Sequence, residues 1–326
     1  MTIALKVHPS FFKEFATKTW VSPADVIKEL IENAFDEDAT RVLITILSDN
    51  SISIEDNAGM DESEIQKFLL LGSPHKKVDS ISPKLKRVRT GRYGTGRLSF
   101  LTSFGKMKIR TRKGNYHKSF LIDTKSLDAL FTGKSNLHEI RETRLSRDGT
   151  EIIVSDAKSF VDELRLIKEI RKLAVLRHPL FEVYIKKSAK FKEWSFSDAE
   201  LIGVPEIQGH RIPLGLDKGN IVGEITVARR PLTEDERGIA VMVGGHIVMR
   251  TLFGFDSKIP RVTGFVRCDS LTSRFADKSA IIEDKEFENF SNLMKKFIVD
   301  TVIPSLTLYE DVLVTREESK IYKQID

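Results

Sequence analysis

The stretch PADVIKELIENAFDEDAT, residues 23–40, constrains the fold more than any other part of the chain. Ser22 offers a hydroxyl at the N-cap position, Pro23 opens the first turn, and Asp25 stands three residues after the cap. This combination predicts the start of a helix. The apolar residues of the stretch recur at helical spacing and predict one buried face: Val26, Ile27, Leu30, Ile31, Ala34 and Phe35.

The opposite stripe of this helix is polar, because four residues follow one another at steps of three and four: Asp25, Glu29, Asn33 and Asp36. A carboxylate and a carboxamide one turn apart can serve a nucleotide. The amide oxygen of Asn33 can ligate Mg²⁺, which prefers hard oxygen ligands, and the carboxylate of Glu29 can orient and deprotonate a water molecule. An ordinary amphipathic helix also carries a solvated polar face, so the helix by itself leaves both interpretations open.

A second polar motif follows a predicted hairpin. Residues 41–47 and 52–55 are typical of two strands joined by a turn, and the second strand runs directly into the sequence DNAGM at 56–60. The carboxylate of Asp56 at a strand end, followed by a glycine that permits close backbone approach, can accept a hydrogen bond from an adenine amino group. Taken alone, the motif can equally be an ordinary turn.

The next segment, residues 73–90, is polar, basic and interrupted by Pro74 and Pro83. A loop of this length tends to be a lid, and its six Lys and Arg residues suit a cover over phosphates, although a solvated loop is the alternative. It runs into GRYGTGR at 91–97, just before an apolar helix start. Glycines in this place let backbone N–H groups converge on a phosphate. The motif is neither a Walker loop nor a dinucleotide-binding fingerprint.

The rest of the chain predicts two domains, 1–195 and 196–326. Further strands are expected at 106–112, 116–123, 150–155 and 181–185, with a helical pattern over 160–176; the second domain has strands at 220–227, 238–249 and 262–269 before a long helix from Phe287 to Val299. The aromatic residues of segment 1–21 predict that it packs on its own domain or on a partner subunit. The polar loop 273–279 carries Lys278, which can be a functional cation or a plain surface lysine.

The composition limits the binding partners and the cellular location that we expect for the protein. The 326 residues carry a formal net charge of +5, which is too weak to indicate nucleic-acid binding. Cys268 is the only cysteine, so a disulfide framework is excluded and a reducing, cytoplasmic location is expected, or a nuclear one in a eukaryote. No segment approaches the roughly 18 apolar residues that span a bilayer, so no membrane association is expected.

Set in order, four stretches resemble the GHKL ATPase superfamily, which includes gyrase, heat-shock chaperones, sensor histidine kinases and MutL. They are ELIENAFDEDAT, EDNAGM, TGRYGTGRLSF and DGTEIIV. The MORC branch is the most similar, because it shares a TW-containing lead-in, a glycine motif like RYGTG and a lid lysine matched at Lys76. His75 and Ala58 depart from the patterns usual in this branch and superfamily. The resemblance implies a two-layer α/β sandwich of the Bergerat type with a mixed sheet, followed by a smaller α/β domain like a transducer.

The resemblance also implies roles for individual residues. Glu29 matches the general base and Asn33 the Mg²⁺ ligand, while Glu32 is a rival base that the family's spacing disfavours. Lys278, with Arg274 as the alternative, would be the cation that a transducer domain sends to the γ-phosphate and takes part in catalysis. The implied ATP-binding residues are Asn33, Asp36, Asp56, Gly59, Met60, Lys76, Gly91, Tyr93, Gly94, Thr95, Gly96, Arg97, Leu98 and Thr150.

The function expected from these residues is a Mg²⁺-dependent ATPase in which ATP closes a lid over about 73–97 and drives homodimerisation. Hydrolysis would then reset a clamp that acts on DNA, as in MORC and MutL relatives, or on a protein client, as in the chaperones. A histidine kinase is disfavoured because none of the seven histidines sits in a recognisable dimerisation helix. A nucleotide-binding regulatory module without turnover remains the non-enzymatic alternative.

Overall fold

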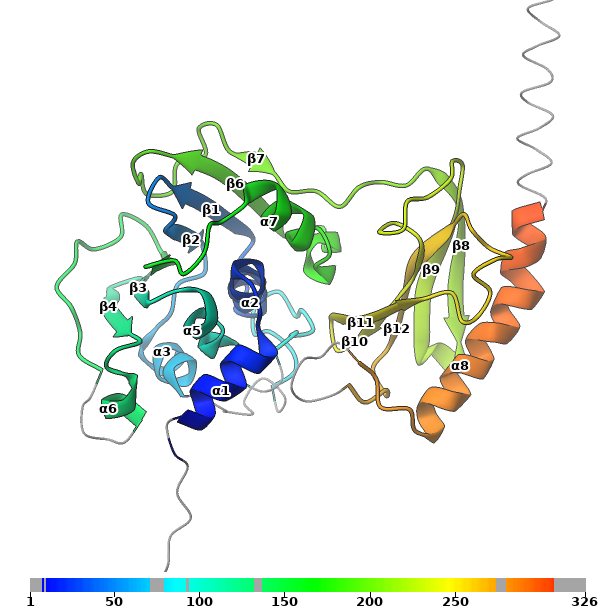
Figure 1. Ribbon diagram of the computed structural model, residues 1–326, viewed down its shortest axis with the longest axis horizontal. Coiled ribbons are helices and arrows are strands. Elements are labelled where there is room, and N and C mark those ends of the chain that lie inside the picture. The colour runs from blue at the N-terminus through cyan, green and yellow to red at the C-terminus, as the bar shows by residue number, and fades with distance from the viewer. Residues whose placement is uncertain are drawn as a thin grey trace, which may run out of the picture. The chain divides into compact units, whose positions relative to one another are not determined.

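The structure is a computed structural model that describes residue 8 and residues 10–70, 79–91, 94–131, 137–273 and 280–307. The chain divides into two compact units, Met1–Val204 and Pro205–Asp326, each with its own sheet (Figure 1). The predicted α/β class is confirmed, since a mixed sheet with helices is followed by a second unit of a mixed sheet and a helix. In the described part of the chain, no helix has the length and apolar character needed to cross a membrane.

The sheet of the first unit has seven strands in the order β4-β3-β5-β2-β1-β6-β7. They are β1 (Arg41–Leu47), β2 (Ile52–Asp56), β3 (Lys106–Lys113), β4 (Tyr116–Asp123), β5 (Gly149–Ser155), β6 (Glu182–Ser188) and β7 (Glu200–Leu201). β1 runs parallel to β6, and the other neighbours are antiparallel. The predicted hairpin of β1 and β2 is confirmed, and it places Asp56 at the end of a central strand.

Helices pack on one face of this sheet. They are α1 (Ser10–Thr19), α2 (Pro23–Asp36), α3 (Glu62–Leu69), α5 (Phe100–Ser103), α6 (Leu127–Phe131) and α7 (Glu163–Ile170), with 3₁₀ turns η1 (Gly96–Leu98) and η2 (Ala174–Arg177). The capping box predicted at Ser22 and Asp25 starts α2, whose apolar face is buried. Ala16 of α1 and Trp20, which follows α1, pack in the core of their own unit, as one of the two expectations for this segment has it.

The helical pattern over 160–176 is broken, which the sequence did not predict. Asp162 accepts a hydrogen bond from the backbone N–H of Arg165, so α7 starts only after Asp162. It ends at Ile170, and the chain continues through η2 to β6. The Asp162 cap therefore starts the helix later than the apolar periodicity does.

The two faces of the seven-stranded sheet differ in character. Alternate residues of the strands, such as Ile44, Ile54 and Ile152, face the helices and join the apolar core. Several of the intervening positions are polar yet buried: Thr45, Ser53, Glu55, Arg110, Glu151 and Lys186. Residues 193–196 lie against this polar face, because the backbone N–H of Trp194 donates to Glu55 and the backbone carbonyl of Ser195 accepts from Lys186.

The second unit has a five-stranded sheet in the order β11-β10-β12-β9-β8, with α8 (Lys285–Phe297) and a π-helical turn (Ile298–Val302) packed on it. Its strands are β8 (Gly209–Leu216), β9 (Ile221–Ala228), β10 (Gly238–Val243), β11 (His246–Thr251) and β12 (Val262–Cys268). The stretch 238–249, expected as strand, forms β10 and β11 joined by a hairpin turn at Gly244 and Gly245. β8 was not predicted, because Pro213 interrupts its pattern; at the edge of a sheet the missing N–H of proline is tolerated.

Candidate functional site

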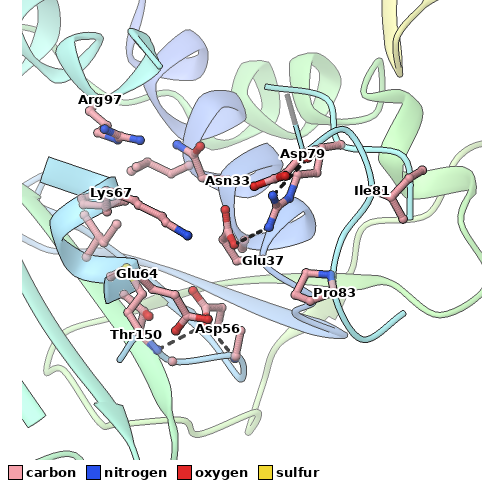
Figure 2. A pocket seen from close by; sticks show the side chains of 18 of the residues that line it. Asn33, Glu37, Asp56, Glu64, Lys67, Asp79, Ile81, Pro83, Arg97 and Thr150 are labelled. Carbon is pink, nitrogen blue, oxygen red and sulfur yellow. Dashed lines mark hydrogen bonds and ion pairs between the residues drawn. The ribbon is translucent and has the colours of Figure 1, made fainter. Parts of the chain in front are cut away.

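A cavity of about 540 Å³ lies on the helix side of the first unit's sheet (Figure 2). This volume falls in the range of small-molecule binding sites. Its walls come from α2, α3, the end of β2, the start of β5 and the segment 79–89. The lining residues are Leu30, Asn33, Ala34, Glu37, Asp56, Ala58, Gly59, Met60, Glu64, Lys67, Phe68, Asp79, Ser80, Ile81, Pro83, Arg89, Arg97, Thr150 and Ile152.

Asp56 is held at the end of β2 by the backbone around it. Its Oδ1 accepts hydrogen bonds from the N–H groups of Ala58 at 2.8 Å and Thr150 at 3.3 Å. Burial raises the pKa of the Asp56 carboxyl above its usual range, because burial disfavours the charged form more than these donors favour it. Its carbonyl oxygen accepts a hydrogen bond from Nη1 of Arg147 at 2.7 Å. A fixed carboxylate at one end of an otherwise apolar part of the cavity suits recognition of an amino group.

The loop after Asp56 needs glycine at position 59 for a structural reason. Gly59 has φ of +72°, and a Cβ there would lie 2.1 Å from the carbonyl oxygen of Arg112. The next backbone N–H, that of Met60, donates to Oγ1 of Thr111 at 2.8 Å, and this hydroxyl lies 3.2 Å from Oγ1 of Thr150. The glycine therefore brings the loop against β3 and β5, which fixes the floor of the cavity.

Two cations face the cavity from the side of α3. Arg97 is 6% exposed; its Nη1 donates to the carbonyl of Leu70 at 2.9 Å, and its guanidinium lies 4.8 Å from the ring centre of Phe68. Burial lowers the pKa of Arg97 to about 10, so the guanidinium is still charged at neutral pH. Figure 2 shows the Lys67 side chain pointing into the cavity towards the space between Asn33 and Asp56. An anion in the cavity would thus meet positive charge on this side.

Asn33 and Glu29 occupy the same stripe of α2 but different surroundings. Asn33 lines the cavity, whereas Glu29 does not. Oε1 of Glu29 accepts a hydrogen bond from Nε1 of Trp20 at 3.2 Å. Oε2 of Glu29 would lie 2.1 Å from a Cβ at position 96, so it packs directly against the backbone of Gly96. The carboxylate therefore contacts the glycine segment next to the cavity rather than the cavity wall.

Asp36 lies outside the cavity wall and holds the end of the segment 79–91. Oδ1 of Asp36 accepts from the N–H of Thr90 at 2.7 Å and from its hydroxyl at 3.0 Å, and Oδ2 accepts from the N–H of Gly91 at 2.9 Å. Arg89 secures the same segment, since its Nη2 lies 3.0 Å from Oε2 of Glu37. Asp36 and Glu37 together tie this segment to the C-terminal end of α2.

The structure brings six of the predicted site residues into one cavity: Asn33, Asp56, Gly59, Met60, Arg97 and Thr150. The cavity wall does not include Glu29, Asp36, Gly91, Gly94, Thr95, Gly96 or Leu98. Lys76, Tyr93, Arg274 and Lys278 lie outside the described residues. Glu32, the rival base, is 8% exposed and is also absent from the wall. The predicted role of each of these residues in binding or catalysis stays a prediction.

Three residues of the site were missed from the sequence: Lys67, Thr111 and Arg147. Lys67 lies in the second turn of α3, and a lysine is ordinary on a helix, so the sequence gave no signal. Thr111 reaches the site because β3 pairs with β5 in a register that sets it opposite Thr150. Arg147 directly precedes Asp148 and Gly149, a dipeptide typical of turns, and this dipeptide was the available hint.

No group of three His, Cys, Asp or Glu side chains that could hold a metal ion by itself occurs among the described residues. The amide of Asn33 is a hard-oxygen donor in the cavity wall. A single protein oxygen of this kind fits Mg²⁺, which keeps several waters and binds through one or two protein ligands together with substrate phosphates.

Part of the first unit is similar in sequence to known proteins. Residues 21–150 match the family model described as histidine kinase-, DNA gyrase B-, and HSP90-like ATPase. The DNA mismatch repair protein MutL of Aquifex aeolicus (strain VF5) is 32% identical over 94 residues, which are 28% of this chain and 22% of that protein. The chain thus spans about a fifth of that relative. The first unit contains an ATPase-type domain of this superfamily with distant similarity to part of MutL, as the motifs predicted.

Proposed function

We propose that the chain binds ATP in the cavity of the first unit and hydrolyses it with the help of Mg²⁺. One observation carries the proposal: Asn33 of α2 and Asp56 of β2 lie in the wall of the same cavity, which also contains Lys67 and Arg97. The carboxylate of Asp56 suits the adenine amino group, and the apolar side chains of Ala58, Met60 and Ile152 suit the faces of the base. The two cations suit the phosphates.

The metal would be held by the amide oxygen of Asn33 together with phosphate oxygens and water. Bound there, Mg²⁺ would neutralise charge on the phosphates and so favour attack on them. Glu29 would accept the proton of the attacking water at Oε2, the oxygen that packs against Gly96. The stripe of α2 provides both groups from one rigid element, which keeps their separation constant.

We further propose that nucleotide binding changes the conformation and the association state of the protein. The basic segment 73–97, including Lys76 and Tyr93, would close over ATP, and two copies of the chain would then associate. Lys278 of the second unit would contact the γ-phosphate, so the presence of that phosphate would decide the position of the unit. The support is the order of the motifs, the MORC-like lead-in and glycine motif, and the similarity to part of a MutL protein.

This similarity favours DNA as the client, held by a clamp, because the relative is a DNA mismatch repair protein. The alternative is a protein client, which an ATPase of the chaperone type would remodel. Pull-down of relaxed circular DNA with ATP, compared with ADP, distinguishes the two: retention of circles only with ATP supports a clamp, and no retention favours a protein client.

The second candidate function is a nucleotide-binding module without turnover. One observation favours it: Glu29 is absent from the cavity wall and its carboxylate already accepts a hydrogen bond from Trp20. In such a module ATP would act as a ligand alone.

Calorimetric titration with ATP and ADP, combined with phosphate release by the same preparation with Mg²⁺ and with a chelator, tests the proposal. We expect binding of both nucleotides and release of phosphate that requires Mg²⁺. Binding without release would support the module, and absence of binding would overturn both functions.

A further inference from the structure

We propose that Trp20 is a positioning residue for hydrolysis: its indole N–H holds the Glu29 carboxylate in the orientation in which Glu29 acts as the base. This inference deepens the proposed function and rests on it. The observation behind it is the hydrogen bond from Nε1 of Trp20 to Oε1 of Glu29, at 3.2 Å.

Trp20 is itself firmly fixed. It is 6% exposed, and its ring packs edge-to-face against Phe15 with 5.9 Å between ring centres. Its backbone N–H donates to the carbonyl of Ala16 at 2.9 Å, which completes the last turn of α1. The following two backbone N–H groups, of Val21 and Ser22, both donate to Oδ2 of Asp25 at 3.1 Å. The indole therefore sits at a rigid junction between α1 and α2.

The Glu29 carboxylate is held from two sides as a result. Its Oε1 accepts from Trp20, and its Oε2 packs against Gly96 of the glycine segment. A glutamate side chain has several rotamers of similar energy, so a fixed donor on Oε1 restricts where Oε2 points. Without that donor Oε2 would spend less time facing the glycine segment, and small displacements of a catalytic group are costly in rate.

Neither Trp20 nor Glu29 lines the cavity. Loss of the indole donor should therefore lower kcat and leave nucleotide affinity unchanged. A residue that only stabilised the fold would instead lower the melting temperature and the active fraction of the protein, whatever group occupied position 29.

Two variants separate the donor from the packing. Trp20→Phe keeps an aromatic ring beside Phe15 and removes the N–H. Trp20→His keeps a five-membered ring whose Nε2 takes the place of the indole Nε1, and removes the second ring. Thr19→Val is the matched control in α1, because it deletes only the hydroxyl that donates to the carbonyl of Phe15 at 2.7 Å.

The experiment measures kcat for ATP hydrolysis, the Kd of ADP and the melting temperature of each variant, alone and combined with Glu29→Gln. We expect Trp20→Phe to lower kcat by about 10- to 100-fold with unchanged ADP affinity, Trp20→His to retain more activity than Trp20→Phe, and Thr19→Val to match wild type. In the Glu29→Gln background Trp20→Phe should cause no further loss, because Trp20 acts through Glu29.

Three results would overturn the inference: wild-type kcat in Trp20→Phe, lower activity in Trp20→His than in Trp20→Phe, or the same fold-loss from Trp20→Phe in both backgrounds. The proposed function fails separately, if the wild-type protein releases no phosphate or if Glu29→Gln releases it at the wild-type rate. Either of these results would also overturn the role of Trp20.

Discussion

Glu55 and Asp56 are consecutive residues of β2, and their carboxylates lie on opposite faces of the seven-stranded sheet. Asp56 lines the cavity, whereas Oε1 of Glu55 accepts a hydrogen bond from the backbone N–H of Trp194 at 2.8 Å on the other face. The guanidinium of Arg147 connects the two faces, because it donates to the carbonyl of Asp56 and lies 3.3 Å from the ring centre of Trp194. One strand thus links the proposed adenine site to the residues that cover the back of the sheet.

Glu55 should make stability depend on pH near neutrality. It is 1% exposed, Oε2 has no hydrogen-bond partner among the described residues, and burial raises the pKa of Glu55 to about 7 from an ordinary value of 4.5. Glu151 opposite it in β5 and Glu193 add to this rise, while the N–H of Trp194 and the charge of Arg147 oppose it. The folded state therefore binds the proton more tightly than the unfolded state. Its contribution to stability is present below about pH 4.5 and is lost as the pH rises through about 7.

Glu55→Gln should accordingly gain stability relative to wild type as the pH rises from 5 to 8, by up to about 3 kcal/mol. Urea unfolding of both proteins across this range measures the difference. Glu193→Gln is the control of opposite sign: hydrogen bonds from Ser146 and the charge of Arg110 hold the pKa of Glu193 below its usual range despite its burial, so this variant should lose stability at neutral pH. A Glu55→Gln difference that does not change with pH would contradict the account.

Asp56→Asn should weaken adenine nucleotide binding itself. The substitution can place an amide donor against the amino group that the carboxylate would accept from, a mismatch of about 1–3 kcal/mol. Calorimetry with ADP measures it, and Asp49→Asn in the exposed turn between β1 and β2 is the control. Unchanged ADP affinity in Asp56→Asn would mean that the base binds elsewhere.

Lys67→Met should weaken binding in proportion to phosphate charge. Lys67 lines the cavity but is exposed, so the expected loss for ATP is at most about 1 kcal/mol, or about fivefold in Kd, and should shrink at high salt. Adenosine should bind the variant and wild type equally. Lys125→Met, which removes an exposed lysine outside the cavity wall, is the matched control. An equal loss for adenosine and ATP would mean that Lys67 contacts the adenine base or only stabilises the fold.

Lys278→Ala tests the proposed sensing of the γ-phosphate, which rests on the sequence alone because Lys278 lies outside the described residues. The variant should hydrolyse ATP more slowly and dimerise less with a non-hydrolysable ATP analogue, while its ADP affinity stays unchanged, since ADP lacks the sensed group. Sedimentation velocity reads out the dimer, and Lys295→Ala in α8 is the control. A variant that dimerises like wild type would mean that Lys278 is an ordinary surface lysine and does not sense the γ-phosphate.

The sequence predicted those parts of the protein that depend on local chemistry. α2 begins where Ser22, Pro23 and Asp25 indicate, and β1 occupies Arg41–Leu47 as expected, because caps and periodicity act over a few residues. The grouping of Asn33, Asp56 and Thr150 followed from the family resemblance rather than from spacing.

What the sequence did not predict depends on contacts between distant segments. Thr111 joins the site only through the register of β3 against β5, and Arg147 through its contacts with Asp56 and Trp194. The hydrogen bond from Trp20 to Glu29 depends on how α1 packs, which periodicity does not give. Asp36 shares the polar stripe of α2 yet binds Thr90 and Gly91, although Asn33 of the same turn lines the cavity.

The central claim is that ATP bound in the cavity is hydrolysed with Glu29 as the base, and phosphate release by Glu29→Gln tests it most directly. The variant keeps the size and hydrogen-bonding shape of the side chain and removes the proton acceptor. We predict a loss of about 10²- to 10⁴-fold in kcat, with ATP affinity within about twofold of wild type in calorimetry on the same sample. Near-normal, Mg²⁺-dependent release by this variant would contradict the account and assign the base to another group, with Glu32 the first to test.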